Sequence, residues 1–204
     1  MLTNLITFLC GSLLLSLAGL ACADADPATN YTIVELQWDM PITPGDASNG
    51  TVTVTGTVQQ AIAQMDALYP GWNERFQSQI SPRADGPVVG AALDELESYN
   101  CNFGTSCIIS YILTGIDYLR GLEGGTKPKN GPGPGNCGRV SCSHNAAIWW
   151  CNDNNAAKEI TWGKIADGAQ VIVDNCRSGS SLKDVKGQAF YKSKWNVIVR
   201  RDPC

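Results

Sequence analysis

The sequence contains a single histidine, His144, and no two cysteines in the C-x-x-C spacing. Structural zinc sites are built mainly from cysteine and histidine at such short spacings, so the pattern does not indicate a zinc site. The sequence also lacks a G-x-S-x-G motif, the strand-to-helix turn that carries the nucleophile of many hydrolases. We therefore expect no enzyme, no metal and no cofactor.

Basic residues are sparse as well. The chain has 15 lysines and arginines against 19 aspartates and glutamates, without a dense basic run. Asp24 to Arg83 contains seven acids and two bases, whereas Ala84 to Cys204 contains twelve acids and thirteen bases. Because nucleic-acid-binding proteins usually carry a concentrated basic patch, we expect no nucleic-acid partner.

Long apolar runs are confined to the beginning of the chain. Leu5 to Ala21 is apolar, and Ala21-Cys22-Ala23 fits the small-x-small rule for cleavage of a secretory signal. A membrane anchor is the alternative, but the run barely reaches spanning length. Residues 1–23 therefore predict a signal peptide and a secreted, extracellular protein.

Cysteine is concentrated in the second half of the chain, where seven residues remain after signal removal. Cysteines clustered in an exported chain usually form disulfides. Their pairing stays open, since six cysteines allow 15 pairings. Seven is odd, so one thiol stays free or pairs between chains, while cleavage after Ala21 would keep Cys22 and make eight.

Residues 24–83 form a cysteine-free N-terminal segment, for which the patterns predict two strands and a helix. Alternation of apolar residues predicts strands over Tyr31–Trp38 and Thr51–Thr57. Thr57 is placed to cap a helix that Pro70-Gly71 ends. Its apolar stripe is Val58, Ile62 and Met65.

Residues 84–204 predict a cysteine-rich α+β domain with the order αββαββ. A short helix is expected over Ala91–Glu97 and a longer one over Thr105–Leu122. Strands are expected over Arg139–Cys142 and Ala146–Cys151, then a helix capped by Thr161, then a hairpin of Lys186–Lys192 and Trp195–Arg201. That order predicts a small sandwich, with helices on one face of an antiparallel sheet, preceded by the short ββα segment.

Several stretches of the second half together resemble a family of small secreted cysteine-rich proteins of filamentous ascomycete fungi, often described as candidate effectors. The stretches are Gly115–Gly121, Gly133–Ser143, Ala147–Asn154 and Asn196–Arg200 with Cys204 just after it. The N-terminal Gly56–Met65 resembles the leader half of the same proteins. The cysteines that fit the family's spacing are Cys101, Cys137, Cys142, Cys151, Cys176 and Cys204. The resemblance thus implies three disulfides among these six, with Cys107 as the extra, free thiol.

The predicted element order, with a terminal cysteine after the last strand, also resembles fungal killer toxins of the killer protein 4 type. Gly187 and Trp195–Val199 match the glycine-led strand and the final strand of those toxins. Cys176-Arg177-Ser178-Gly179 departs from their C-G-S element after the second helix. The resemblance therefore implies a fold more than it implies their ion-channel activity.

The neighbouring tryptophans Trp149 and Trp150 are the candidate binding residues. Adjacent residues on a strand face opposite sides, so one should face the core and the other outward. An outward tryptophan would suit a sugar or a host protein, and the alternative is that helices and loops cover both.

Two features bear on processing in the secretory pathway. Sequons at Asn30 and Asn49 predict N-linked glycans. Pro82-Arg83 lies in a linker rich in proline and glycine, so Arg83 is a candidate processing site and the N-terminal segment a candidate propeptide. An ordinary interdomain arginine is the alternative.

Candidates for catalysis are few. His144 follows Ser143 and Cys142, so a Ser-His or Cys-His pair is conceivable. Asp153, Glu159 and Asp167 could supply the paired carboxylates of a glycoside hydrolase. We expect instead a histidine on the surface or on a strand, and loop or helix-cap charges.

The sequence thus predicts a secreted effector-like or killer-toxin-like protein that binds a host or competitor target. The target could be a protein, a membrane component or a glycan. We expect a monomer, with a disulfide-linked dimer through the odd cysteine as the alternative. The alternative functions are a secreted carbohydrate-active or other hydrolase and a structural protein of the cell wall.

Overall fold

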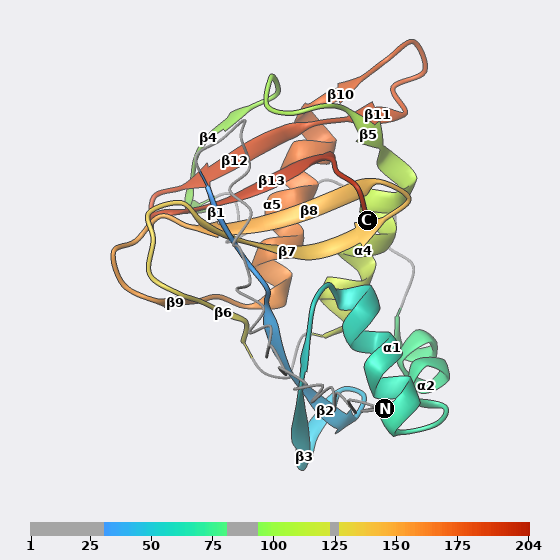
Figure 1. Cartoon of the computed structure of the whole chain (residues 1–204). Helices are drawn as coiled ribbons and strands as arrows, with labels where there is room; N and C mark the ends of the chain where they lie inside the picture. Colours follow the sequence, from blue (N-terminus) through green and yellow to red (C-terminus); the bar gives the residue numbers. More distant parts are fainter. Residues whose placement is uncertain (1–30, 81–93, 123–126) are drawn as a thin grey trace, which may run out of the picture.

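The computed structural model of the chain describes residues 31–80, 94–122 and 127–204. The expected signal peptide, Asn30 and Arg83 lie outside the described residues. The helices are α1 (Val58–Leu68), α2 (Trp72–Gln79), α4 (Ile109–Gly121) and α5 (Trp162–Asn175) (Figure 1). The strands are β1 (Thr32–Val34), β2 (Gln37–Thr43), β3 (Asp46–Thr55), β4 (Leu96–Asn100), β5 (Cys107–Ile108), β6 (Lys129–Asn130), β7 (Asn136–Ser143), β8 (Ala146–Asn152), β9 (Lys158–Glu159), β10 (Arg177–Ser178), β11 (Asp184–Val185), β12 (Gly187–Tyr191) and β13 (Trp195–Arg201). The α+β class is confirmed.

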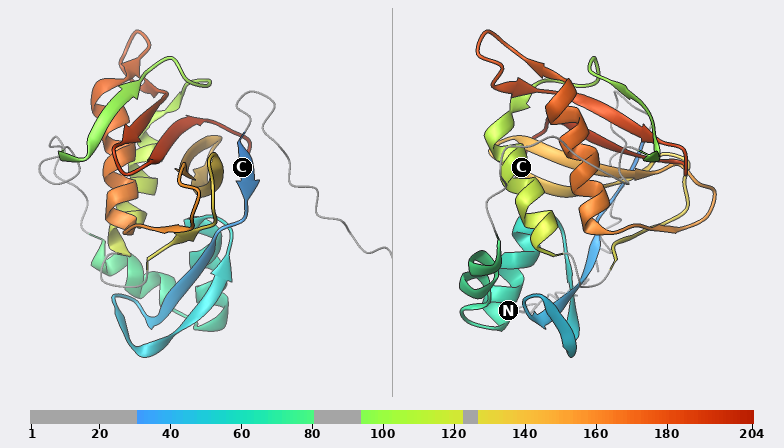
Figure 2. Two further views of the ribbon diagram at one scale, coloured as in Figure 1. Left: turned by 90° about the vertical axis from the view of Figure 1, so that its left-hand side faces the viewer. Right: turned by 180° about the vertical axis from the view of Figure 1, so that it is seen from behind.

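A six-stranded sheet forms the centre of the structure, in the order β1-β7-β8-β13-β12-β4. Its strands pair antiparallel except β1, which runs parallel to β7 from Thr32↔Asn136 to Val34↔Gly138. Helices α4 and α5 lie side by side on one face of this sheet (Figure 2). The N-terminal segment therefore supplies one edge strand of the sheet that the cysteine-rich part builds.

The two long helices lie close to the sheet because a glycine stands at each contact point. A Cβ on Gly115 of α4 would lie 2.4 Å from the Ser141 hydroxyl, and one on Gly168 of α5 would lie 2.6 Å from a methyl of Val197. The predicted cap of α5 is present, since the Thr161 side chain accepts a hydrogen bond from the Lys164 amide.

Three disulfides cross-link the cysteine-rich part, and they use the six cysteines expected to pair. They are Cys101–Cys176, Cys137–Cys151 and Cys142–Cys204. The first joins the end of β4 to the end of α5, the second joins β7 to β8, and the third ties β7 to the residues after β13. Disulfides that close such loops restrict the unfolded chain and so stabilise a modest core.

The N-terminal segment shares its core with the cysteine-rich part. Trp38 of β2 stacks on Trp162 of α5 with ring centroids 3.9 Å apart, and the two indoles are 1% and 3% exposed. Leu36 packs at Gly138 of β7, where a Cβ would lie 2.3 Å from the leucine side chain. One continuous cluster of buried apolar residues runs through both parts of the chain.

The structure corrects several predicted elements. The strand expected over Tyr31–Trp38 is two strands, because the chain leaves the edge of the sheet after β1 and begins the β2–β3 hairpin at Gln37. The helix expected over Ala91–Glu97 ends earlier than predicted: Asp94 is helical, but Leu96 and Glu97 belong to β4. Pairing with the open edge of β12 outweighs the local helix propensity there. The helix expected from Thr105 begins at Ile109, because β5 pairs with β11 first.

Replacing Trp38 with alanine should lower the free energy of unfolding by about 3–5 kcal/mol, the usual cost of deleting a buried tryptophan. The cause is the loss of the stack on Trp162 and of the hydrogen bond that the indole N–H donates to the Gly56 carbonyl at 2.6 Å. Denaturant unfolding with the disulfides intact measures this change.

The matched control is Leu68→Ala at the exposed end of α1, which should change stability by less than about 0.5 kcal/mol. If the Trp38→Ala chain unfolded in two steps, with the cysteine-rich part keeping its wild-type midpoint, the shared core would be refuted.

Candidate functional site

A cavity of about 470 Å³ lies between α1, α2 and α4. We call it the α1–α2–α4 groove. Its lining residues come from all three helices and are Gln59, Ile62, Ala63, Asp66, Ala67, Asn73, Gln77 and Tyr118. The volume falls in the range of about 300–1,000 Å³ that is usual for small-molecule sites.

The sequence of α1 explains which side chains reach the groove. A capping box starts the helix: the Thr57 side chain accepts from the Gln60 amide, and the Gln60 side chain accepts from the Thr57 amide. The predicted stripe of Val58, Ile62 and Met65 is buried. Gln59, Ala63 and Asp66 lie at helical spacing beside that stripe and so share the face that lines the groove.

Hydrogen bonds within the protein hold the polar groove side chains in place. Asp66 Oδ1 accepts a hydrogen bond from the backbone N–H of Asn73 at 2.9 Å. Gln77 Nε2 donates to the side-chain oxygen Oδ1 of Asn73 at 3.2 Å. Within the described residues, the second carboxylate oxygen of Asp66 and the side-chain nitrogen of Asn73 have no partner. The groove therefore presents one charged acceptor and one amide donor from neighbouring positions.

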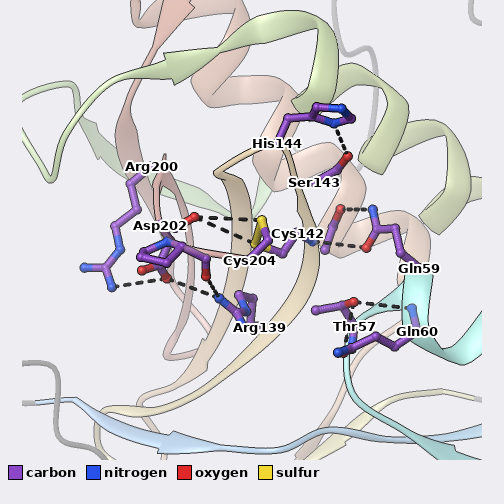
Figure 3. Close-up of a disulfide and its surroundings, with 12 residues drawn as sticks. Thr57, Gln59, Gln60, Arg139, Cys142, Ser143, His144, Arg200, Asp202 and Cys204 are labelled. Carbon is purple, nitrogen blue, oxygen red and sulfur yellow. Dashed lines mark hydrogen bonds and ion pairs between the residues drawn. A yellow bond between two sulfur atoms is a disulfide. The ribbon is translucent and has the colours of Figure 1, made fainter.

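Gln59 connects this groove to the central sheet. Its Nε2 donates to Ser141 Oγ at 2.8 Å, and its Oε1 accepts from the Cys142 amide at 3.1 Å (Figure 3). Cys142 is itself bonded to Cys204. The side-chain amide of Gln59 thus fixes α1 against β7, which the disulfide Cys142–Cys204 already anchors.

The described part of the N-terminal segment, residues 31–80, is acidic. It contains five acids and one base, Arg75. Within the described residues no basic side chain forms an ion pair with Asp66. This charge balance favours neutral or cationic ligands in the groove over anionic ones.

The two candidate binding tryptophans face opposite sides of the sheet, as the alternation predicts, but both are covered. Trp150 is fully buried in the main core. Trp149 is 6% exposed on the other face, with the guanidinium groups of Arg139 and Arg200 each 5.5 Å from its ring centroid. The hypothesis of a solvent-facing tryptophan is therefore wrong.

The cover over Trp149 comes from three parts of the described chain. Tyr31, Ile33 and Phe103 pack on this face of the sheet. Residues after β13 also close over it: Arg139 Nη1 donates to the Pro203 carbonyl at 2.5 Å, and Cys204 is held by its disulfide (Figure 3). A smaller cavity of about 260 Å³ remains beside Trp149 and Arg139. Since Arg139 is engaged with the C-terminal residues, the larger groove is the better candidate site.

His144 lies in the turn between β7 and β8. Its Nδ1 is 2.8 Å from Ser143 Oγ (Figure 3). Its ring stacks on Tyr111 with the ring centroids 4.1 Å apart. Both His144 and Asn145 have positive φ, as a tight two-residue hairpin turn requires. Cys142 is disulfide-bonded, so its sulfur does not form a thiol pair with this histidine.

Two of the three carboxylates considered for glycoside hydrolysis have structural partners. Asp167 forms an ion pair with Arg120 at 2.6 Å. Asp153 accepts from the Asn196 side chain at 2.7 Å and from the Gly135 amide at 3.2 Å. Glu159 lies on the short strand β9.

Asn49, the sequon residue within the described chain, is exposed on β3 and accessible to glycosylation. The helix α2 and the groove residues Asp66, Asn73, Gln77 and Tyr118 were not among the sequence-based candidates. The polar face of α1 could have pointed to Asp66. No helix was expected after Pro70-Gly71, so the spacing of Asn73 and Gln77 carried no signal.

Within residues 31–80, 94–122 and 127–204 there is no group of three metal-ligating side chains. None of the helices in these ranges combines the length and the hydropathy that a membrane span needs. Comparison with protein-family models, with curated proteins and with solved structures finds no match.

Cys107 is the one cysteine of the described residues that forms no disulfide, and it is 5% exposed. Burial, and after it the nearby carboxylate of Asp184, raises the pKa of the thiol from its ordinary 9.0 to about 12. Buried, protonated thiols are poor nucleophiles. A disulfide to a second chain through Cys107 would therefore require opening of the strand β5.

We expect Cys107 to resist alkylation by iodoacetamide at pH 8 in the folded, unreduced protein and to react once the protein is unfolded. Peptide mass spectrometry identifies the labelled site. Because the thiol pKa is raised in the folded state, the stability that depends on the neutral thiol should decline as pH rises from 9 towards 12. Rapid labelling of Cys107 under native conditions would contradict its burial.

Proposed function

We propose that this chain is a secreted effector-like or toxin-like protein that acts by binding a molecule of a host or a competitor, and that the α1–α2–α4 groove is its recognition site. The observation that best supports this proposal is the groove itself. It combines a volume of about 470 Å³ with polar side chains that the protein's own hydrogen bonds already orient. Pre-oriented groups lose little entropy on binding.

The scaffold supports this proposal. Gln59 holds α1 on β7, and the disulfide Cys142–Cys204 anchors β7 beside it. Rigid support of this kind lets a small protein present a defined surface. Three disulfides are also typical of the oxidising environments in which exported proteins act. The resemblance of the sequence to small secreted cysteine-rich ascomycete proteins and to killer protein 4 toxins also supports this proposal.

Filling the groove with an arginine at Ala67 should abolish binding to target cells without unfolding the protein. Ala67 is exposed on α1 and lines the groove, so a long side chain there occupies the cavity at little cost to the helix. Binding of the labelled protein to cells of candidate hosts and of competing fungi, measured by flow cytometry, checks this.

Leu68→Arg is the matched control, since it places the same side chain on the same helix at an exposed position that does not line the groove. It should bind as the wild type does. If Ala67→Arg and Ala63→Arg, both folded by circular dichroism, bound cells as well as the wild type, the groove would not be the recognition site.

A further inference from the structure

We propose that the ligand of the α1–α2–α4 groove is a neutral, hydroxyl-rich molecule, namely a short saccharide. This inference rests on the proposed recognition role of the groove and specifies the ligand. Three observations carry it: the pairing of donor and acceptor at Asp66 and Asn73, the mixed polar and apolar lining, and the charge around the site.

The first observation concerns hydrogen bonding. Asp66 and Asn73 are neighbours, because the carboxylate accepts from the Asn73 backbone amide at 2.9 Å. Within the described chain this leaves one carboxylate oxygen and one amide N–H₂ unpaired at the same place. A hydroxyl group both donates and accepts, so adjacent sugar hydroxyls can donate to Asp66 and accept from Asn73. A hydrogen bond to a carboxylate is stronger than one between neutral groups.

Gln77 extends this polar edge by one helical turn. It lies four residues after Asn73 on α2 and donates to Asn73 Oδ1 at 3.2 Å. This bond fixes the Asn73 amide with its nitrogen free for a ligand. It also leaves the side-chain oxygen Oε1 of Gln77 without a partner in the described residues, as a further acceptor for a hydroxyl.

The second observation is the apolar part of the lining. The cavity is lined by three aliphatic residues of α1 and by the phenol ring of Tyr118 of α4. The aliphatic residues are Ile62, Ala63 and Ala67. Sugar rings have an apolar C–H face, which packs on aliphatic and aromatic side chains, while their hydroxyls point outward to polar groups. The small alanines at exposed helix positions leave the space that a ring needs.

The third observation is electrostatic. Asp66 forms no ion pair within the described residues, and residues 31–80 hold five acids against one base. A phosphorylated, sulfated or uronic-acid ligand would bring a second negative charge next to this carboxylate, which is unfavourable. The site therefore selects uncharged saccharides over acidic ones.

The first test uses a panel of immobilised neutral oligosaccharides of about two to four units, with sulfated and uronic-acid oligosaccharides beside them. We expect binding to neutral members and not to acidic ones. Asp66→Asn keeps the shape of the side chain but removes the charged acceptor, so it should weaken binding by about tenfold or more. Glu74→Gln removes the same charge on α2 outside the groove lining and should leave binding unchanged.

Binding of the panel that is unaffected by both Asp66→Asn and Ala67→Arg would overturn the inference, because the saccharide would then bind elsewhere. Preference for acidic oligosaccharides would overturn it as well.

A second test separates this inference from the proposed function. Target cells are treated either with periodate, which oxidises vicinal diols of sugars, or with a protease. Binding of the wild type that is lost after periodate and kept after protease supports a saccharide ligand. Binding that is lost after protease and kept after periodate overturns the saccharide, yet leaves the groove as a recognition site if Ala67→Arg still abolishes it.

Discussion

Strand β8 (Ala146–Asn152) is buried along its whole length, and this burial on both faces of a single sheet determines the arrangement of the rest of the chain. Helices α4 and α5 cover one face. A single sheet has a second face, and here that face carries Trp149, two disulfide-bonded cysteine pairs and Ile198. Burying so much apolar surface requires a second cover, which Tyr31, Ile33, Phe103 and the residues after β13 provide.

The same requirement places the candidate site. Because β1 must reach the edge of β7, the chain that follows it is held at that end of the sheet. Trp38 then stacks on Trp162, and Gln59 bonds to the backbone of Cys142. These contacts bring α1 and α2 against α4, and the groove lies where the three helices meet. Its polar side chains are thus positioned by contacts made for the core.

Short sequence patterns correctly predicted the helices and strands that are stabilised by residues close to one another in sequence. The caps at Thr57 and Thr161, the stripe of α1 and the closing hairpin are present because each depends on residues close in sequence. The errors depend on distant partners: β4 exists because β12 offers an open edge, and the strand expected over Tyr31–Trp38 is divided because its first part pairs with β7. Helix α2 follows Gly71, whose φ of 80° lets the chain restart a helix directly after α1. The groove could not be predicted, since it needs α2 and two contacts across the chain.

The structure also links two hypotheses that the sequence left independent. Processing after Arg83 treats the N-terminal segment as removable, whereas the proposed site takes two of its three helices from that segment. No disulfide of the described chain joins residues 31–80 to the remainder. Cleavage is therefore compatible with binding at the groove only if the segment stays attached through non-covalent contacts. The stack of Trp38 on Trp162, the pairing of β1 with β7 and the two hydrogen bonds of Gln59 are the contacts that would retain it.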